Sequence, residues 1–334
     1  MSTVHQSAPL DLRPTFNTRL LKLELESSEV APSSTISLGL HVTSLANAPP
    51  YTAVSYVWGL PSPTKQILLN GQPFTVRQNL WDLLSRLRDV KYDDYLWIDA
   101  LSIDQTNDKE KNHQVAMMGS IYKQAELTIA WFGAAIKDAA KDIKRLKRMH
   151  SEKTVPVAGL APYAAGLNYL FYNPYWTRTW ILQEYVLSTD VIVMCGKCTI
   201  TTAALEWIAH KWVESSSDDL PLFRGDAWKI ITQTNASKRS DGSTSRKRLS
   251  RLTSLLSMTE QTVCVDPRDR IYALLSLLSK REREIWAITP DYEKSAQTLF
   301  EDLCNVLRSR TLDIVKHRSD VWFVEQRLRD ILLL

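Results

Sequence analysis

Glycine is scarce in this chain: 10 of its 334 residues are glycine, and no two of them are spaced as Gly-x-Gly. The glycine-rich loops of dinucleotide-binding folds and of P-loop enzymes need such spacing to bring the backbone close to a phosphate, so the sequence excludes both motifs. Cysteine is also rare, at 4 residues. That number is too small for a disulfide framework and is typical of a protein from a reducing compartment.

Long apolar runs and a dominant charge are missing as well. The longest apolar stretch, residues 127–136, is half as long as the roughly 20 residues that a membrane-spanning helix needs. The polar N-terminus predicts no secretory signal. The 41 basic and 37 acidic residues nearly balance, which gives no general attraction to nucleic acid or to membranes. We therefore expect a soluble, cytoplasmic protein without a membrane partner, with the nucleus as the alternative location.

Aromatic residues are abundant, with 11 Trp and 12 Tyr, and a chain of this length can bury them in a large core. Strand-like stretches alternate with amphipathic helical patterns, which is typical of an α/β fold with a mainly parallel sheet flanked by helices. The expected strands are 51–57, 66–72, 74–76, 95–99, 127–132 and 190–194, and the expected helices are 80–87, 107–125, 137–150, 174–187, 266–278 and 295–308.

Local signals refine this pattern. Asn70-Gly71 predicts a tight hairpin turn between two strands. Asp266, followed by Pro267, predicts the start of a helix. Residues 151–168 hold proline and glycine and are expected to form a loop. The chain then falls into three expected parts: an N-terminal strand and loop extension over 1–50, an α/β core over 51–200, and a mostly helical part over 201–334 that packs on the core.

Five sequence blocks, in order along the chain, resemble the heterokaryon incompatibility (HET) domain of fungi. The blocks are 51–59 (YTAVSYVWG), 96–105 (LWIDALSIDQ), 114–125, 178–184 (RTWILQE) and 266–275 (DPRDRIYALL) with 290–292 (PDY). This resemblance implies a role in non-self recognition and in programmed cell death when unlike hyphae fuse. It also implies self-association and a fungal incompatibility partner protein.

The HET domain is in turn similar to TIR domains, the signalling modules of plant and animal innate immunity. Ser55-Tyr56 ends an expected strand in the way that is usual in TIR domains. Trp180 and Glu184 keep the spacing of the TIR Trp-Cys-x-x-Glu motif but lack its cysteine. The resemblance therefore implies a TIR-like, flavodoxin-like sheet. By analogy with enzymatic TIR domains, it implies cleavage of NAD(P) at the nicotinamide–ribose bond.

Glu184 is the candidate catalytic residue under this analogy. The nicotinamide of NAD+ is already cationic and leaves as a neutral ring, so one carboxylate near the ribosyl cation suffices, whereas ordinary glycosidases need two. Helical spacing places Trp180 beside Glu184, where the indole would form the floor of a nucleoside site. The alternative is structural, with Glu184 paired to Arg178 or to another basic neighbour.

The candidate substrate-binding residues lie where expected strands end. They are Ser55, Tyr56, Trp58, Gly59, Trp97, Asp99 and Trp180. Ligands of open α/β sheets bind outside the carboxyl ends of strands, so the aromatic rings would stack on the bases and Asp99 would hold a ribose. The alternative assigns the aromatic residues to the core, and the glycine and the aspartate to turns and helix caps.

Other site classes have weaker signals. No metal site is predicted, because Cys195 and Cys198 form a lone C-x-x-C without a second pair of ligands. No cofactor is expected either, and NAD(P) enters as a substrate. Whether the protein is an enzyme stays open at this stage.

Two further functions compete with an NAD(P) glycohydrolase. One is a non-enzymatic, self-associating interaction module that acts through the exposed helix 137–150 and the aromatic-rich segment 163–180. The other, weaker one is a regulator that contacts nucleic acid through the basic loop over 238–251. That loop has little aromatic interleaving, so a nucleic-acid partner is not expected.

Overall fold

The computed structural model describes residues 4–12, 16–24, 35–157, 159–215, 252–309 and 320–333. The chain divides into two compact units, each built from separate segments. Unit 1 consists of Met1–Asp104, Gln124–Tyr175 and Ser188–Arg224, and unit 2 consists of Gln105–Lys123, Trp176–Leu187 and Gly225–Leu334. The sequential parts expected from the sequence divide the chain in a different way. The basic loop over 238–251 lies outside the described residues.

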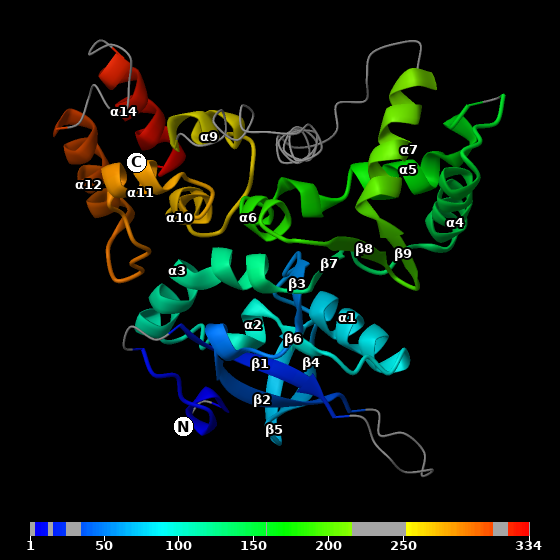
Figure 1. Ribbon diagram of the computed structural model, residues 1–334, viewed down its shortest axis with the longest axis horizontal. Helices are drawn as coiled ribbons and strands as arrows, with labels where there is room; N and C mark the ends of the chain where they lie inside the picture. Colours follow the sequence, from blue (N-terminus) through cyan, green and yellow to red (C-terminus); the bar gives the residue numbers. More distant parts are fainter. Residues whose placement is uncertain are drawn as a thin grey trace. The chain divides into compact units, whose positions relative to one another are not determined.

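Unit 1 contains a nine-stranded sheet with the order β5-β4-β2-β1-β6-β3-β7-β8-β9 (Figure 1). The strands are β1 Asn17–Leu23, β2 Ser37–Ser44, β3 Tyr51–Tyr56, β4 Thr64–Leu69, β5 Gln72–Arg77, β6 Tyr95–Trp97, β7 Leu127–Trp131, β8 Val191–Cys195 and β9 Cys198–Thr201. The neighbours β6, β3, β7 and β8 run parallel to one another. The hairpins β4–β5 and β8–β9 and the pairs β1–β2 and β1–β6 are antiparallel.

The α/β class is thus confirmed. The sheet combines the parallel strands β6, β3, β7 and β8 with antiparallel pairs on both sides. Part of the antiparallel pairing comes from the first fifty residues. Strands β1 and β2 pair along Asn17↔Ser44 to Leu23↔Leu38 as an antiparallel hairpin. This hairpin inserts into the sheet between β4 and β6, so these residues are part of the sheet instead of an extension beside it.

Helices complete both units. In unit 1 they are α1 Gln78–Asp89, α2 Asp99–Ser102, α4 Lys137–Glu152, α5 Ala164–Phe171 and α7 Thr202–Ser215. In unit 2 they are α3 Asp108–Gln124, α6 Ile181–Val186, α9 Leu252–Met258, α10 Asp269–Leu275, α11 Lys280–Trp286, α12 Ala296–Ser309 and α14 Asp320–Ile331. None of the helices in the described ranges has the length and apolar character needed to cross a membrane.

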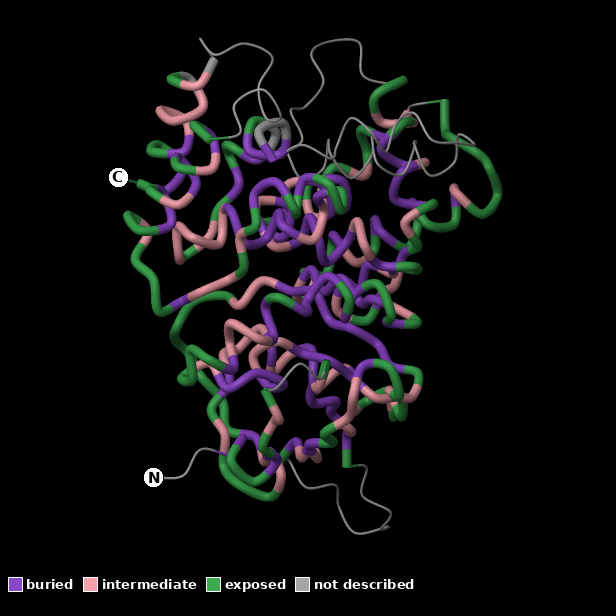
Figure 2. The backbone as a smooth tube through the Cα atoms, turned by 60° about the vertical axis from the view of Figure 1, so that its left-hand side comes forward, coloured by how far each residue is buried: buried purple, intermediate pink, exposed green. Residues whose placement is uncertain are grey.

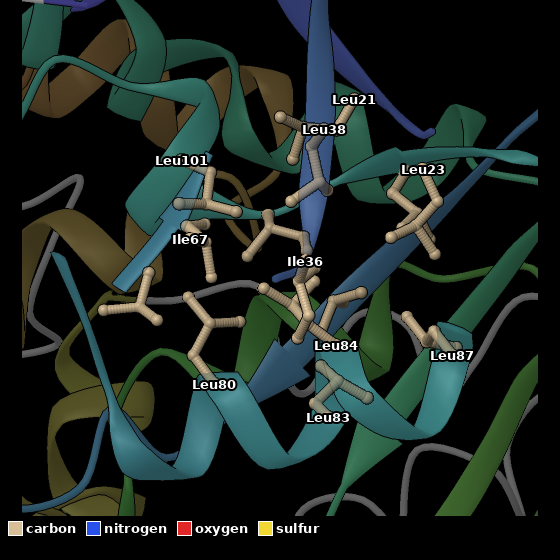
Figure 3. Packing of buried hydrophobic residues seen from close by; sticks show 14 of the residues in the cluster. Leu21, Leu23, Ile36, Leu38, Ile67, Leu80, Leu83, Leu84, Leu87 and Leu101 are labelled. Atoms are coloured by element: carbon tan, nitrogen blue, oxygen red, sulfur yellow. The ribbon is translucent and has the colours of Figure 1, made fainter. Parts of the chain in front are cut away.

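The core of unit 1 forms where α1 covers the sheet. Its leucines at positions 80, 83, 84 and 87 recur at helical spacing and are at most 2% exposed. Figure 3 shows them in one cluster with Leu21, Leu38 and Ile67 of the strands. Each fully buried leucine contributes about 1.5–3 kcal/mol by leaving water, so this stripe fixes the helix on the sheet.

The predicted hairpin turn is confirmed. Asn70 and Gly71 have φ values of 51° and 73°, the left-handed backbone that a two-residue type I′ turn requires. β3, in contrast, is buried at all of its positions, as a strand in the middle of a covered sheet must be. Figure 2 shows how buried and exposed residues alternate along the chain.

The expected helix over 174–187 is interrupted. A 3-10 turn occupies Pro174–Thr177, and α6 begins at Ile181. Between them, the backbone pairs with Val263: Val263 N donates to Thr177 O at 2.6 Å, and Thr179 N donates to Val263 O at 3.2 Å. Backbone groups that are satisfied by a distant partner cannot also continue the helix ladder, which explains the break.

Candidate functional site

The carboxyl ends of β3 and β6 form one edge in unit 1, because the two strands are parallel neighbours. Trp58 lies just beyond the end of β3, and Asp99 begins α2, with Ile98 between it and β6. The structure brings the two together: Trp58 Nε1 donates to Asp99 Oδ2 at 2.7 Å. The other carboxylate oxygen accepts from Ala100 N at 2.7 Å. Both side chains stay partly exposed, so this edge presents an oriented carboxylate to solvent.

Arg77 completes this edge and was missed by the sequence reasoning. Its guanidinium lies 5.4 Å from the centre of the Trp58 ring, and Nη1 donates to Gly59 O at 2.7 Å. Gly59 has a φ of 76°, which turns the chain after β3. No local motif marks Arg77, because its role depends on β5 ending close to this turn. A cation, an indole and a carboxylate thus lie side by side.

Asn79 fixes the same edge from the first turn of α1. Its Nδ2 donates to Val57 O at 2.6 Å, and its Oδ1 accepts from Trp131 Nε1 at 2.8 Å. The asparagine therefore ties the end of β3 to the end of β7. We call Trp58, Gly59, Arg77, Asn79 and Asp99 the strand-end site.

Three predicted substrate-binding residues of unit 1 face the core. Tyr56 belongs to the buried hydrophobic cluster. Ser55 Oγ lies 2.7 Å from the hydroxyl of Tyr175, and Trp97 Nε1 donates to Thr18 Oγ1 at 2.9 Å. All three are at most 2% exposed, so no face of these side chains is open to a ligand in this conformation. Their surroundings match the core alternative.

Glu184 lies in unit 2 in a bidentate ion pair. Arg178 Nη1 and Nη2 donate to the two carboxylate oxygens at 2.9 and 3.1 Å. The Glu184 side chain is 2% exposed and that of Arg178 15%. This geometry agrees with the structural alternative given above, in which Glu184 pairs with Arg178. The pair bridges the break before α6. The catalytic role of Glu184 stays a prediction.

Trp180 has a different partner. Its indole hydrogen-bonds Asp269, the first residue of α10. Asp269 also accepts from the Tyr292 hydroxyl at 2.6 Å. Burial raises the pKa of the Asp269 carboxyl, and these two hydrogen bonds oppose that rise. Trp180 and Glu184 therefore share a helical turn but are held by separate groups.

The surroundings of Asp269 form a polar cluster that the sequence divided between two blocks. Lys111 Nζ lies 3.6 Å from the centre of the Tyr292 ring. Asp266 accepts from Arg268 N at 3.0 Å and binds the Arg268 guanidinium, and α10 begins three residues after Asp266, so the expected helix start is displaced. The block resemblance named these residues without predicting their contacts.

Metal and thiol chemistry find little support in the described part of the chain. No group of three or more metal-ligating side chains occurs there. Cys195 and Cys198 face each other across the β8–β9 hairpin as free, buried cysteines. Burial raises the pKa of the Cys195 thiol, which disfavours the reactive thiolate.

Comparison with known proteins gives two matches of different kind. Residues 51–184 match the family model described as heterokaryon incompatibility protein (HET). The chain is also similar to heterokaryon incompatibility protein 6, OR allele, of Neurospora crassa, with 24% identity over 205 residues. That match covers 47% of this chain and 30% of the relative, so the chain spans under a third of its length. No solved structure matches.

Proposed function

Because this chain is a HET-domain protein, with the domain over residues 51–184, we propose that it acts in non-self recognition between fungal cells. The similarity to a Neurospora protein that is named for heterokaryon incompatibility supports this role. Programmed cell death as the output, and self-association with an incompatibility partner protein as the trigger, belong to the same proposal. The cytoplasm is the proposed location.

At the molecular level, the proposed ligand is a dinucleotide of the NAD(P) class, bound at the strand-end site. The observation that carries this is the Trp58–Asp99 hydrogen bond of 2.7 Å at the carboxyl ends of two parallel strands. Ligands of open α/β sheets bind at this edge. The Asp99 carboxylate suits ribose hydroxyls, and the guanidinium of Arg77 suits a pyrophosphate.

Cleavage of the bound dinucleotide is the further step that the TIR likeness suggests. Water would attack the ribose C1′ while its bond to the nicotinamide nitrogen breaks. Nicotinamide would leave neutral, and one proton would go to solvent. Glu184 is the residue that the TIR analogy assigns to this step. Both of its oxygens are bound to Arg178, so this ion pair must open before the carboxylate can serve.

A second candidate function is a non-enzymatic interaction module, and the Arg178–Glu184 pair favours it. A buried bidentate pair satisfies the carboxylate without any ligand. In this case the domain would signal through its surfaces, after self-association or binding of a sensor protein.

The experiment follows NAD+ consumption and nicotinamide release by the purified protein, clustered through a fused oligomerising tag. Asp99→Asn tests binding at the strand-end site, and Glu184→Gln tests cleavage. Asp89→Asn, which removes an exposed carboxylate at the end of α1, is the matched control.

Turnover that both test variants abolish while they stay folded would support the enzyme. NAD+ binding without turnover, weakened by Asp99→Asn alone, would keep the nucleotide site and favour the interaction module. If the folded wild type neither binds nor consumes NAD+, the nucleotide proposal is overturned.

A further inference from the structure

Helix α4, Lys137–Glu152, has two faces of opposite character. One is buried and includes Ala139, Ile143 and Leu146, each 0% exposed. The other is exposed and strongly basic. Its basic residues are Lys137, Lys141, Lys144, Arg145, Lys147 and Arg148. With 3.6 residues per turn, these side chains occupy an arc of about 160° opposite the buried stripe. We call this arc the basic face.

Few acidic groups offset the basic face. Asp142 is buried and accepts from Gly166 N at 3.2 Å. Glu152 pairs with Arg148 at 2.7 Å, and Asp138 is exposed in the first turn. Within the described part of the chain, no carboxylate forms an ion pair with the basic side chains between Asp138 and Arg148. The charge of the basic face is therefore largely uncompensated.

A pocket opens at the C-terminal end of the basic face. Its volume is about 520 Å³. The residues that line it are Arg145, Arg148, Met149, Glu152, Thr154, Val155, Pro156 and Tyr163. Two guanidinium groups thus stand at the side of a hollow whose remaining wall combines apolar side chains with the polar Glu152 and Thr154. Val155 is 37% exposed, so an apolar group of a partner can reach it.

We propose that the basic face is a docking surface for an acidic segment of a partner protein, anchored by one aliphatic side chain in the pocket. Charge complementarity selects the acidic segment. The helix is about 24 Å long, which matches about seven residues of extended chain. A pocket that pairs apolar walls with arginines fits a peptide carrying both acidic and aliphatic side chains.

Nucleic acid and lipid fit this surface less well. Single strands are held by several stacked aromatic rings, and Tyr163 is the one aromatic residue that lines the pocket. An anionic bilayer would meet the lysines but would leave the hollow unfilled. The proposal is independent of nucleotide binding, because the strand-end site shares no residue with the basic face.

The test uses the full chain and a fluorescein-labelled peptide of about ten residues, rich in Glu and Asp with one central Leu. Fluorescence anisotropy gives its affinity. The variant Lys141→Glu/Lys144→Glu/Arg145→Glu is expected to weaken binding by roughly tenfold or more, because like charges then meet. Lys280→Glu/Arg281→Glu on α11, also exposed, is the matched control and is expected to bind like the wild type.

A second variant tests the pocket. Val155→Asp is expected to weaken binding of the Leu-containing peptide several-fold. It should not change the affinity for a control peptide in which Gly replaces the central Leu. Equal affinity of both peptides for the wild type would overturn the anchored arrangement. The choice of partner would be overturned if phosphatidylserine vesicles or a single-stranded oligonucleotide bound more tightly than the acidic peptide and this binding depended on α4. If the α4 and α11 variants weaken peptide binding equally, the basic face is not the docking surface.

Discussion

Arg178 holds both carboxylate oxygens of Glu184, with N–O distances of 2.9 and 3.1 Å, in a pair of which Glu184 is almost completely buried. Removing one partner leaves the other charge buried and unpaired. Glu184→Ala is therefore expected to lower the free energy of unfolding by about 3–5 kcal/mol, measured by urea denaturation. A loss below about 1 kcal/mol would mean that the pair is exposed to water in solution.

The same pair sets a control for any activity measurement. Loss of NAD+ turnover in Glu184→Ala has two explanations, catalysis and unfolding. The double variant Arg178→Met/Glu184→Leu is expected to recover much of the lost stability, because it removes both buried charges. Turnover that stays absent in this folded double variant would point to the carboxylate, and turnover that returns would exclude it.

Gly119 permits a close approach within unit 2. A Cβ at this position of α3 would lie 2.4 Å from Ser276 Cβ and 3.1 Å from Leu187 Cδ1. Gly119→Ala is expected to destabilise the protein by about 1–3 kcal/mol through overpacking, although alanine favours helices. Thermal unfolding measures this, with the exposed Ser120→Ala as control. Ser276→Gly by itself removes the hydrogen bond from Ser276 to Gln183, so the test is a double-mutant cycle. Gly119→Ala should cost less stability in the Ser276→Gly background than in the wild type, and equal costs would contradict the contact.

Asp269 predicts a dependence of stability on pH. Burial raises its pKa above the ordinary value of 3.8, so the folded state favours the protonated carboxyl. The contribution is fully present below pH 3.8 and is lost as pH rises through the folded pKa. Asp269→Asn keeps an acceptor for Tyr292 but cannot ionise. Relative to this variant, the wild type should lose stability as pH rises above 3.8 in urea titrations. If the difference in free energy of unfolding between the two proteins does not change with pH, the raised pKa of Asp269 is contradicted.

The Trp58–Asp99 bond predicts a spectroscopic signal for the strand-end site. NAD+ binding should change the fluorescence of Trp58, and Trp58→Phe should remove that change. Asp99→Asn should weaken binding by roughly tenfold, because a charge-assisted bond to ribose becomes a neutral one. Asp93→Asn, at another exposed carboxylate of unit 1, should leave the affinity unchanged. Equal weakening by both variants would place the nucleotide elsewhere.

Local signals predicted what depends on neighbours in the sequence. The Asn70-Gly71 turn and the leucine stripe of α1 were predicted because backbone preference and helical spacing determine them. The sequence also placed Trp58 and Asp99 at strand ends, and parallel pairing brought them together. Local signals misled at residues 164–168, the end of the expected loop, because α5 begins at Ala164 and packs Gly166 against Asp142.

What the sequence could not predict depends on distant partners. The insertion of β1 and β2 between β4 and β6 is decided by which edges find each other, and no local pattern encodes this. The break before α6 needs Val263, which lies more than eighty positions away from Thr179. Arg77 reaches the strand-end site by the same kind of distant contact. The partner of Glu184, in contrast, was among the alternatives because it lies in the same block.

The order of strands in the sheet decides how the domain can be cut for expression. A fragment limited to the family match, residues 51–184, would lack β1, β2, β8 and β9. Its sheet would be split between β4 and β6, with unpaired edges on both sides of the gap and next to β7. Open edges of this kind template aggregation. Fragments that begin before Asn17 and continue past Thr201 keep every strand with its neighbours, and these are the boundaries to clone.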